Sequence, residues 1–561
     1  MRLLRPIPAA AVMASALCAV ATPMSAQAAA RADVIVVNAA IYTADDARPR
    51  ADGMAVQGGR VTYVGTSAGA RALASTATRV IDARGQTVVP GMVDGHAHLS
   101  GLGQALRIVD LTGTTSYQQV IDRVVARART APKGSWVLGR GWDQNDWSDK
   151  NFPTHDLLTR AVPDHPVLLT RIDGHANVAN ATAMELAGVT ATVKDPDGGR
   201  VERDAKGFPT GVFVDRAMGM VSRIVPPPSQ AQWREMVLAA IAECNKWGLT
   251  GVHDAGQGPA MIRLYEQLAR EGRYNLRNYV MISDGPGLDS LLAVGPKNGL
   301  SDGRLWIRSI KLYGDGALGS RGAALLAPYS DDPKNTGLLI ASLAHIRDVS
   351  VKALKAGFQV NTHAIGDRAN RVALDAYEQA FAQVPGKDHR FRIEHAQIIS
   401  PADIPRFAKL KVLPSMQASH QTSDMYWAKD RLGEARLAGA YAWRSLLRTG
   451  VIIPNGSDFP VEQVNPLISF HSAVTRQDAK HWPAGGWRPE EKMTRTEALK
   501  SMTLWPAIAG FQEAELGTLA AGKRADFVIL SQDIMTVAAE KILDTRVIAT
   551  YLGGKAVYEK R

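Results

Sequence analysis

The chain has 561 residues, of which 46% are hydrophobic and 21% are charged, and this composition is typical of soluble globular proteins. Its length allows more than one domain and a large buried core. The formal net charge is +11, but the Lys and Arg residues are scattered, with no long basic run and no interleaved aromatic residues. We therefore expect a solvated basic surface and no nucleic-acid partner.

Residues 1–28 have the layout of a secretory signal peptide. A basic start, MRLLRPIP, precedes the apolar stretch AAAVMASALCAVAT, and SAQAAAR then offers a small-residue cleavage pattern. The apolar stretch is too short to cross a bilayer, and Leu17 before Cys18 disfavours lipid attachment. We expect cleavage near Ala28 and export to the periplasm or secretion, with no membrane anchor. Only Cys244 would then remain, so the mature chain could form no internal disulfide.

The two ends of the mature chain share a β-type texture. Short runs of β-forming residues punctuated by Asp and Gly occupy residues 33–65, and similar runs return at 517–533 and 546–560. We predict one small β-sandwich built from both ends, residues 29–88 and 513–561. Two separate β-modules are the less economical alternative, because each would have to bury a face alone.

Strand-like and helix-like runs alternate through the middle of the chain, which is the pattern of an α/β fold. The helix-like runs include residues 229–248 and 369–384. We predict a (β/α)8 TIM-type barrel from residues 89–113 and 231–512, interrupted by an inserted α/β subdomain at 114–230, because the gap between the first two strands is too long for one crossover. The eight candidate strands are 92–99, 249–256, 277–283, 308–316, 358–366, 391–397, 411–417 and 451–459.

Residues that can bind metal gather towards the ends of these strands, where barrel active sites form. Taken singly, each has an ordinary explanation: Asp458 could stabilise a turn, and Lys311 could be a paired lysine. Chance rarely places six such residues at one end of a single barrel. The set that predicts metal chemistry is His96, His98, Lys311, His363, His395 and Asp458.

The motifs resemble those of the amidohydrolase superfamily, and of its amidohydrolase-3 (YtcJ-like) branch in particular. They cover nearly the whole mature chain in order. The resemblance implies the barrel, the insertion and the composite sandwich, and the hydrolysis of amide-like bonds with a divalent metal, commonly zinc. The matching motifs are PGMVDGHAHL, GWDQNDW, RIDGHANVAN, KLYGDGALGSRGAALLAPY, NTHAIGDRA, RIEHAQ, NGSDFPVE and GTLAAGKRADFVIL.

The same resemblance implies roles for single residues. His96, His98 and Asp458 would hold one ion, and His363 and His395 the other. Lys311 occupies the position where related binuclear enzymes have a carboxylated lysine that bridges both ions. An unmodified ammonium group cannot ligate a cation, so without the carbamate the site would be mononuclear and Lys311 could only pair with a carboxylate such as that of Asp315.

Other residues are expected around the metal. Asp367 and Glu394 adjoin metal histidines and are expected to orient them, because metal-bound imidazoles usually donate their second N–H to such groups. His253 shows no motif that would make it a ligand. The candidate substrate contacts, each of which also has a structural alternative, are Trp142, His175, Arg321, Gln417 and His420.

These residues predict an exported, metal-dependent amidohydrolase that uses metal-activated water to cleave a C–N bond of a small amide, N-acyl or N-formyl compound. Asp458 would accept the proton of the water and pass it to the leaving nitrogen. A cyclic-amide or ester hydrolase on the same site is one alternative, and a non-catalytic periplasmic metal- or ligand-binding protein is another. The oligomeric state stays open, with a homo-oligomer among the alternatives. The chain has no GxSxG motif, and Cys244 lies in a helical stretch, which disfavours a serine or cysteine nucleophile.

Overall fold

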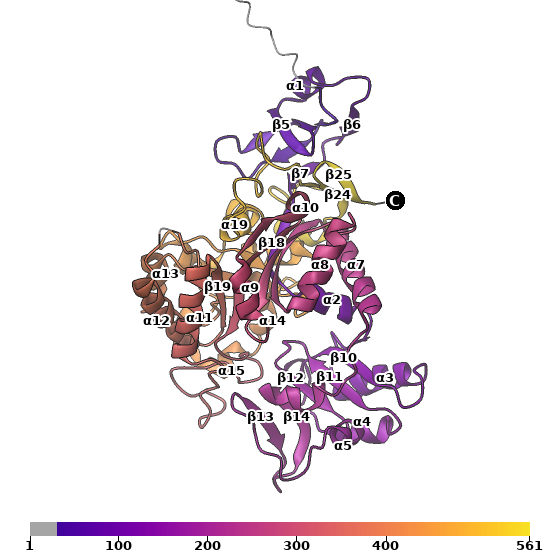
Figure 1. The fold of residues 1–561 in the computed structure, drawn as a ribbon, viewed down its shortest axis with the longest axis vertical. Coiled ribbons are helices and arrows are strands. Elements are labelled where there is room, and N and C mark those ends of the chain that lie inside the picture. Colours follow the sequence, from indigo (N-terminus) through magenta and orange to yellow (C-terminus); the bar gives the residue numbers. More distant parts are fainter. Residues whose placement is uncertain (1–30, 387, 561) are drawn as a thin grey trace, which may run out of the picture.

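The computed structural model describes residues 31–386 and 388–560. The signal peptide predicted for residues 1–28 lies outside them. Figure 1 shows three parts: a β-sandwich at the top, a barrel in the middle and the inserted subdomain at the bottom. Within the described part of the chain, no helix is both long enough and apolar enough to cross a membrane.

The barrel is a nearly closed sheet of eight parallel strands in chain order, which confirms the predicted TIM-type fold. Its first and last strands meet where His98 N–H donates to the Phe459 carbonyl (2.9 Å) and Asp458 N–H donates to the His96 carbonyl (2.7 Å). The strands are β8 (Met92–Ala97), β15 (Leu249–Gln257), β16 (Arg277–Ser283), β18 (Leu305–Tyr313), β19 (Gln359–Ala364), β20 (Arg392–His395), β21 (Leu413–Gln417) and β22 (Asn455–Gly456).

Amphipathic helices cover the outside of the barrel and bury their apolar sides against the strands (Figure 1). Short polar caps define where several of them begin; for example, Ser229 and Gln232 form a reciprocal capping box at the start of the first helix. The main covering helices are α7 (Gln230–Lys246), α8 (Pro259–Arg270), α9 (Leu288–Val294), α11 (Leu343–Ala356), α12 (Asp367–Gln383), α13 (Ile404–Leu410) and α17 (Pro466–Thr475).

The inserted subdomain is an α/β unit with its own hydrophobic core. Its six-stranded sheet has the order β13-β14-β12-β11-β10-β9 and packs against α3 (Tyr117–Ala128), α4 (His155–Ala161) and α5 (Ala181–Leu186). The sheet begins just before residue 114, the predicted start of the insertion. Its strands are β9 (Val109–Asp110), β10 (Val137–Trp142), β11 (Val167–Arg171), β12 (Ala176–Ala179), β13 (Gly199–Arg203) and β14 (Pro209–Asp215).

The sandwich is built from both ends of the chain, as predicted. One sheet has the order β5-β4-β1-β6, and the other has the order β25-β24-β23-β7-β2-β3 and so combines N-terminal with C-terminal strands. Both sheets contribute to one buried core, which includes Val36, Met54, Phe527 and Tyr551. The strands are β1 (Val34–Val37), β2 (Ala40–Tyr42), β3 (Arg50–Ala51), β4 (Gly53–Gln57), β5 (Arg60–Gly65), β6 (Arg79–Asp82), β7 (Thr87–Pro90), β23 (Phe527–Leu530), β24 (Val547–Leu552) and β25 (Lys555–Glu559).

Candidate active site

A cavity of about 1680 Å³ lies between the carboxyl ends of the barrel strands and the inserted subdomain. The barrel contributes His98, Lys311, His363, His395 and Asp458 to its lining, and the insertion contributes Arg140, His175 and Asp215. Ligand sites in such barrels form at this end because the loops that follow the strands all emerge there.

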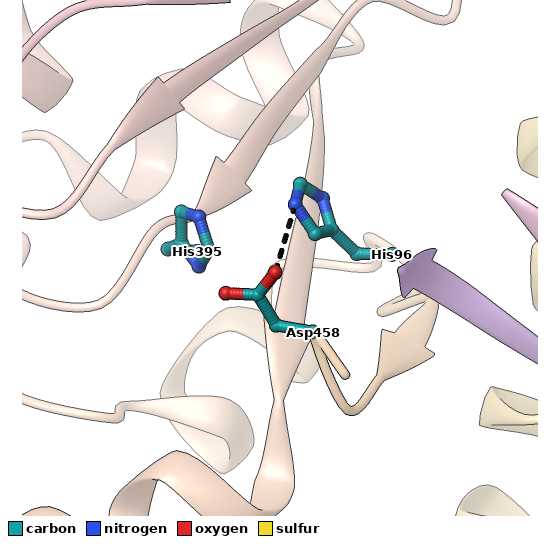
Figure 2. Close-up of side chains that lie close together, drawn as sticks. All are labelled: His96, His395 and Asp458. Atoms are coloured by element: carbon teal, nitrogen blue, oxygen red, sulfur yellow. Dashed lines mark ion pairs between the residues drawn. The ribbon is translucent and has the colours of Figure 1, made fainter. Parts of the chain in front are cut away.

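Three buried side chains converge at the bottom of the cavity. His96 belongs to β8, His395 ends β20 and Asp458 follows β22 (Figure 2). One ligand atom from each of the three lies within 4.8 Å of the other two. His395 and Asp458 have positive φ angles of 75° and 61°. Such backbone conformations are costly for residues other than glycine and are enriched at functional sites.

The histidines in this region turn one ring nitrogen outwards to a hydrogen-bond acceptor. The Nδ1 atom of His98 lies 3.0 Å from the Ala255 carbonyl oxygen, and that of His395 lies 2.7 Å from the amide oxygen of Gln417. His96 Nδ1 pairs with the Glu394 carboxylate. Because these partners accept hydrogen bonds, each Nδ1 carries the proton and each Nε2 keeps a lone pair, which is the state that binds metal. The lone pair of His96 Nε2 faces Lys311 Nζ at 3.1 Å.

The carboxylate that orients His96 is itself held by a fully buried arginine. Arg392 Nε lies 2.7 Å from Glu394 Oε1, and Arg392 also donates to His253 Nδ1 (2.7 Å) and to Ser415 Oγ (2.8 Å). Burial alone would raise the pKa of Glu394, but Arg392 and then His96 lower it to about 2. The predicted orienting role of Glu394 therefore has a direct geometric basis, and His253 lies in the supporting network.

Asp458 stands among imidazoles. Its Oδ1 atom is 3.0 Å from His98 Nε2 and 3.5 Å from His96 Nε2, and its Oδ2 atom is 3.8 Å from His420 Nε2. Burial raises the pKa of Asp458, but His98, His96 and then His395 hold it well below its usual value. Oδ1 is buried without a hydrogen-bond partner among the described residues. Oxygen and nitrogen lone pairs that face each other at such distances fit a bound cation, and this donor set suits zinc and similar ions.

Lys311 and His363 form a second group beside this cluster. Lys311 Nζ lies 3.1 Å from His96 Nε2, and burial lowers the pKa of Lys311 to about 8. The rings of His363 and His395 have centroids 4.5 Å apart. His363 Nε2 faces Asp315 Oδ1 at 3.5 Å, while the Asp315 carboxylate also accepts backbone N–H groups. Asp315 thus positions the residues that follow His363. The described residues show no ion pair between Asp315 and Lys311.

The predicted substrate contacts differ in their placement. His175 lines the cavity, with its Nδ1 atom 2.7 Å from Asp215 Oδ1. His420 also lines it, and its Nε2 atom is buried without a hydrogen-bond partner in the described part of the chain. Gln417 does not line the cavity, because it lies behind His395 and accepts its hydrogen bond.

Two further candidates lie away from the cavity, which argues against direct contact with substrate. Trp142 is fully buried in the core of the insertion, where it packs near Trp147 and donates to the Leu169 carbonyl at 2.9 Å. Arg321 forms an ion pair with Asp331 at 3.0 Å. Asp367, expected to orient a metal histidine, instead accepts the backbone N–H of Leu326 at 2.8 Å.

Several residues at the site were not among those predicted from the sequence. Arg140 lies two residues before Trp142 in the motif GRGWDQNDW, and its side chain lines the cavity. Asp215 and Asp315 position His175 and His363. Arg140 could have been predicted, because it lies near the end of a strand-like run, as the candidate metal ligands do.

The family comparison agrees with this geometry. A family model described as "Amidohydrolase family" matches residues 79–558. Protein LONG AFTER FAR-RED 3 of Arabidopsis thaliana is 34% identical over 540 residues, which cover 94% of this chain and 92% of that protein. YtcJ of Bacillus subtilis is 33% identical over 491 residues, with 87% and 92% covered.

Two further comparisons concern catalysis. The N-substituted formamide deformylase of Arthrobacter pascens is 28% identical over 548 residues, which cover 94% of this chain and 98% of that enzyme. A crystal structure of a metal-dependent hydrolase from Pyrococcus furiosus matches with a TM-score of 0.71 and 30% identity, covering 90% of this chain and 100% of that one. The resemblance inferred from the motifs is thereby confirmed, and the chain belongs to the amidohydrolase family.

Proposed function

We propose that this protein is an exported metal-dependent amidohydrolase that hydrolyses the C–N bond of a small N-acyl or N-formyl amide. The observation that carries the proposal is the convergence of His96, His98 and His395 on Asp458, with a lone pair on each Nε2, at the floor of a cavity large enough for a small molecule. The similarity to a formamide deformylase supports the formyl or acyl amide over other substrates of the superfamily.

We propose zinc as the ion, bound first by His96, His395 and Asp458 with His98 beside them. A second ion would be bound by His363 and by a carboxylated Lys311. Carboxylation would form an N–C bond between Nζ and carbon dioxide and release two protons from the ammonium group, one to give the neutral amine and one on carbamate formation. The cation beside His96 would thereby be replaced by an anion. When bound, such ions activate water and polarise a carbonyl group.

The protein's own groups would move the protons. Asp458 would accept a proton from the attacking water at a carboxylate oxygen and later deliver it to the leaving nitrogen, so that an amine and a carboxylic acid are formed. Its low pKa keeps it ionised, as this first transfer requires. His175 and His420 line the cavity where the acyl group and the amine would lie.

The proposal can be tested on the purified mature protein by elemental analysis combined with hydrolysis assays on N-acyl and N-formyl amides. We expect one or two divalent ions per chain, and turnover that disappears with a chelator. The variant Asp458→Asn should lower kcat by about 100-fold to 10,000-fold, because a positioned general base contributes that much. The exposed residue Asp164, changed to Asn, provides the matched control.

The alternatives predict other results. Turnover of lactams or esters without turnover of open amides would favour the cyclic-amide or ester hydrolase. Bound metal without any turnover would favour the binding protein, and full activity of Asp458→Asn would remove Asp458 as the base.

We also propose that the protein is exported, on the basis of the signal-peptide pattern of residues 1–28. The mass of the protein recovered from the periplasm or the medium should then correspond to a chain that begins shortly after Ala28. A full-length chain found only in the cytoplasm would contradict this proposal.

A further inference from the structure

Two arginines on neighbouring strands of the insertion have very different surroundings. Arg171, on β11, has a partner at each of its three nitrogens: its Nε atom donates to Gln144 Oε1 (2.8 Å), and its terminal nitrogens pair with Asp143 and Asp173. Arg140, on the adjacent strand β10, also lines the cavity. A guanidinium group offers five N–H donors, and Arg171 shows how this part of the protein satisfies one internally.

Arg140 lacks such partners. The described residues give its side chain one hydrogen bond, from Nη2 to the Ile172 carbonyl at 2.7 Å, and no carboxylate within 4.0 Å. Its Nε atom is buried without a partner. Burial lowers the pKa of Arg140, and the negative charges of Asp458 and then Asp173 oppose that shift. Asp458 therefore attracts the guanidinium group without forming an ion pair with it.

The backbone of Gly174 lies beside the end of the guanidinium group and places no side chain there. Gly174 has a φ angle of +75°, and a Cβ atom built there would lie 3.4 Å from both Nη1 and Nη2 of Arg140. The positive φ angle favours glycine at position 174, and glycine places no side chain over the guanidinium group of Arg140. A cation that is largely removed from water and not neutralised is costly, and the cost is recovered when an anion binds.

We propose that Arg140 binds a carboxylate group of the substrate, so that the preferred amides are anionic, as in an N-acyl amino acid. The planar guanidinium fork matches a carboxylate, and Arg140 faces the cavity from the insertion while the metal-binding cluster lies on the barrel side. The inference rests on the proposed function for the identity of the scissile bond, but the anion site itself can be tested by binding alone.

The binding test uses a stable pair of compounds that differ only in the carboxylate. 2-Isobutyl-4-oxopentanoate is N-acetylleucine with a methylene in place of the N–H, and 6-methyl-2-heptanone is the same molecule without the carboxylate. By calorimetry on the metal-loaded protein, we expect the acid to bind about tenfold to a hundredfold more tightly, the usual range for a charge-assisted hydrogen-bonded pair. Arg140→Gln should abolish this preference, and Arg160→Gln, a change at an exposed arginine of the same subdomain, should retain it.

Equal binding of the two compounds by the unchanged protein would overturn the inference. A preference that persists in Arg140→Gln would also overturn it, because the acid would then be bound by the metal or by another cation. The matched substrates N-acetylleucine and N-acetyl-isopentylamine separate this inference from the proposed function. If neither is hydrolysed while the Arg140-dependent binding remains, the reaction is misassigned and the anion site stands. If both are hydrolysed, Arg140→Gln should raise KM for the acid alone.

Discussion

The candidate metal site has two halves, and they differ in how completely the protein arranges their side chains. In the first half, formed by His96, His98, His395 and Asp458, every imidazole has an outward hydrogen-bond partner, which leaves its inner nitrogen without a proton. In the second half, formed by Lys311 and His363, the lysine directs a cationic nitrogen at His96, and His363 Nε2 faces Asp315. The first half can hold a cation as it stands, whereas the second requires a chemical change at Lys311.

This difference sets an order of metal binding. A cation in the first half would meet a carboxylate and neutral imidazoles, with the Lys311 ammonium group at its edge, 3.1 Å from His96 Nε2. A cation in the second half would have that buried ammonium group in the place of a ligand. Carboxylation would reverse the sign of that charge. We therefore expect the first half to bind an ion whether or not Lys311 is modified, and the second to bind only when it is.

The largest effect that separates the halves is expected from Lys311→Ala. Elemental analysis should give about one ion per chain instead of two, and kcat should fall by at least about tenfold to a hundredfold, since one of the two ions that share the reacting charges is lost. The exposed lysine Lys355, changed to Ala, is the matched control. An unchanged metal content in Lys311→Ala would mean that the halves are not distinct and that Lys311 is structural.

Glu394→Gln tests the first half in turn. The amide keeps the shape of the side chain but removes the charge that fixes His96 and balances Arg392. Affinity for the first ion, measured by competition with a chelator, should fall by about tenfold to a hundredfold. Glu185→Gln, on the exposed side of α5 (Ala181–Leu186), should not change it. If the variant lost stability but kept its metal affinity, Glu394 would support the barrel and not the ligand.

Much of the fold was predictable from the sequence, because its signals are local. Buried parallel strands appear in a sequence as apolar runs, and each predicted barrel run overlaps a strand of the structure. The eighth is instructive: the run 451–459 predicts a full strand, but only Asn455–Gly456 pairs. Val451 and Ile453 are buried but lie outside the paired strand, so burial and strand pairing are separate properties that one pattern cannot distinguish.

The convergence of the candidate metal ligands was predictable for a similar reason, since the ends of parallel strands meet at one face of a barrel. No such rule predicts which side chains of the inserted subdomain reach the cavity. Trp142 and Arg140 lie two residues apart on β10, yet Trp142 fills the core and Arg140 reaches the cavity. The strand is irregular between these two residues: Gly141 has a φ angle of +111°, and the pairing with β11 shifts register between Arg140 and Trp142. Such irregularity depends on tertiary packing, and the alternation of a regular strand does not predict it.

The smallest effect is expected from a substitution remote from both halves, and it serves as the reference for the metal losses expected in the other variants. Glu497 caps α18 (Arg495–Ser501) and pairs with Arg444 at 2.6 Å, and this pairing lowers the pKa of Glu497 from 4.5 to about 2. A lowered pKa stabilises the folded state fully above pH 4.5, and the contribution is lost as the pH falls towards 2. Because the group is partly exposed, we expect Glu497→Gln, which keeps the cap, to cost about 1 kcal/mol in urea unfolding at pH 7. The difference from the unchanged protein should shrink as the pH is lowered through this range, with metal content unaffected. A loss of metal in this variant would show that general destabilisation alone empties the site, and the metal losses expected for Lys311→Ala and Glu394→Gln would then no longer distinguish its two halves.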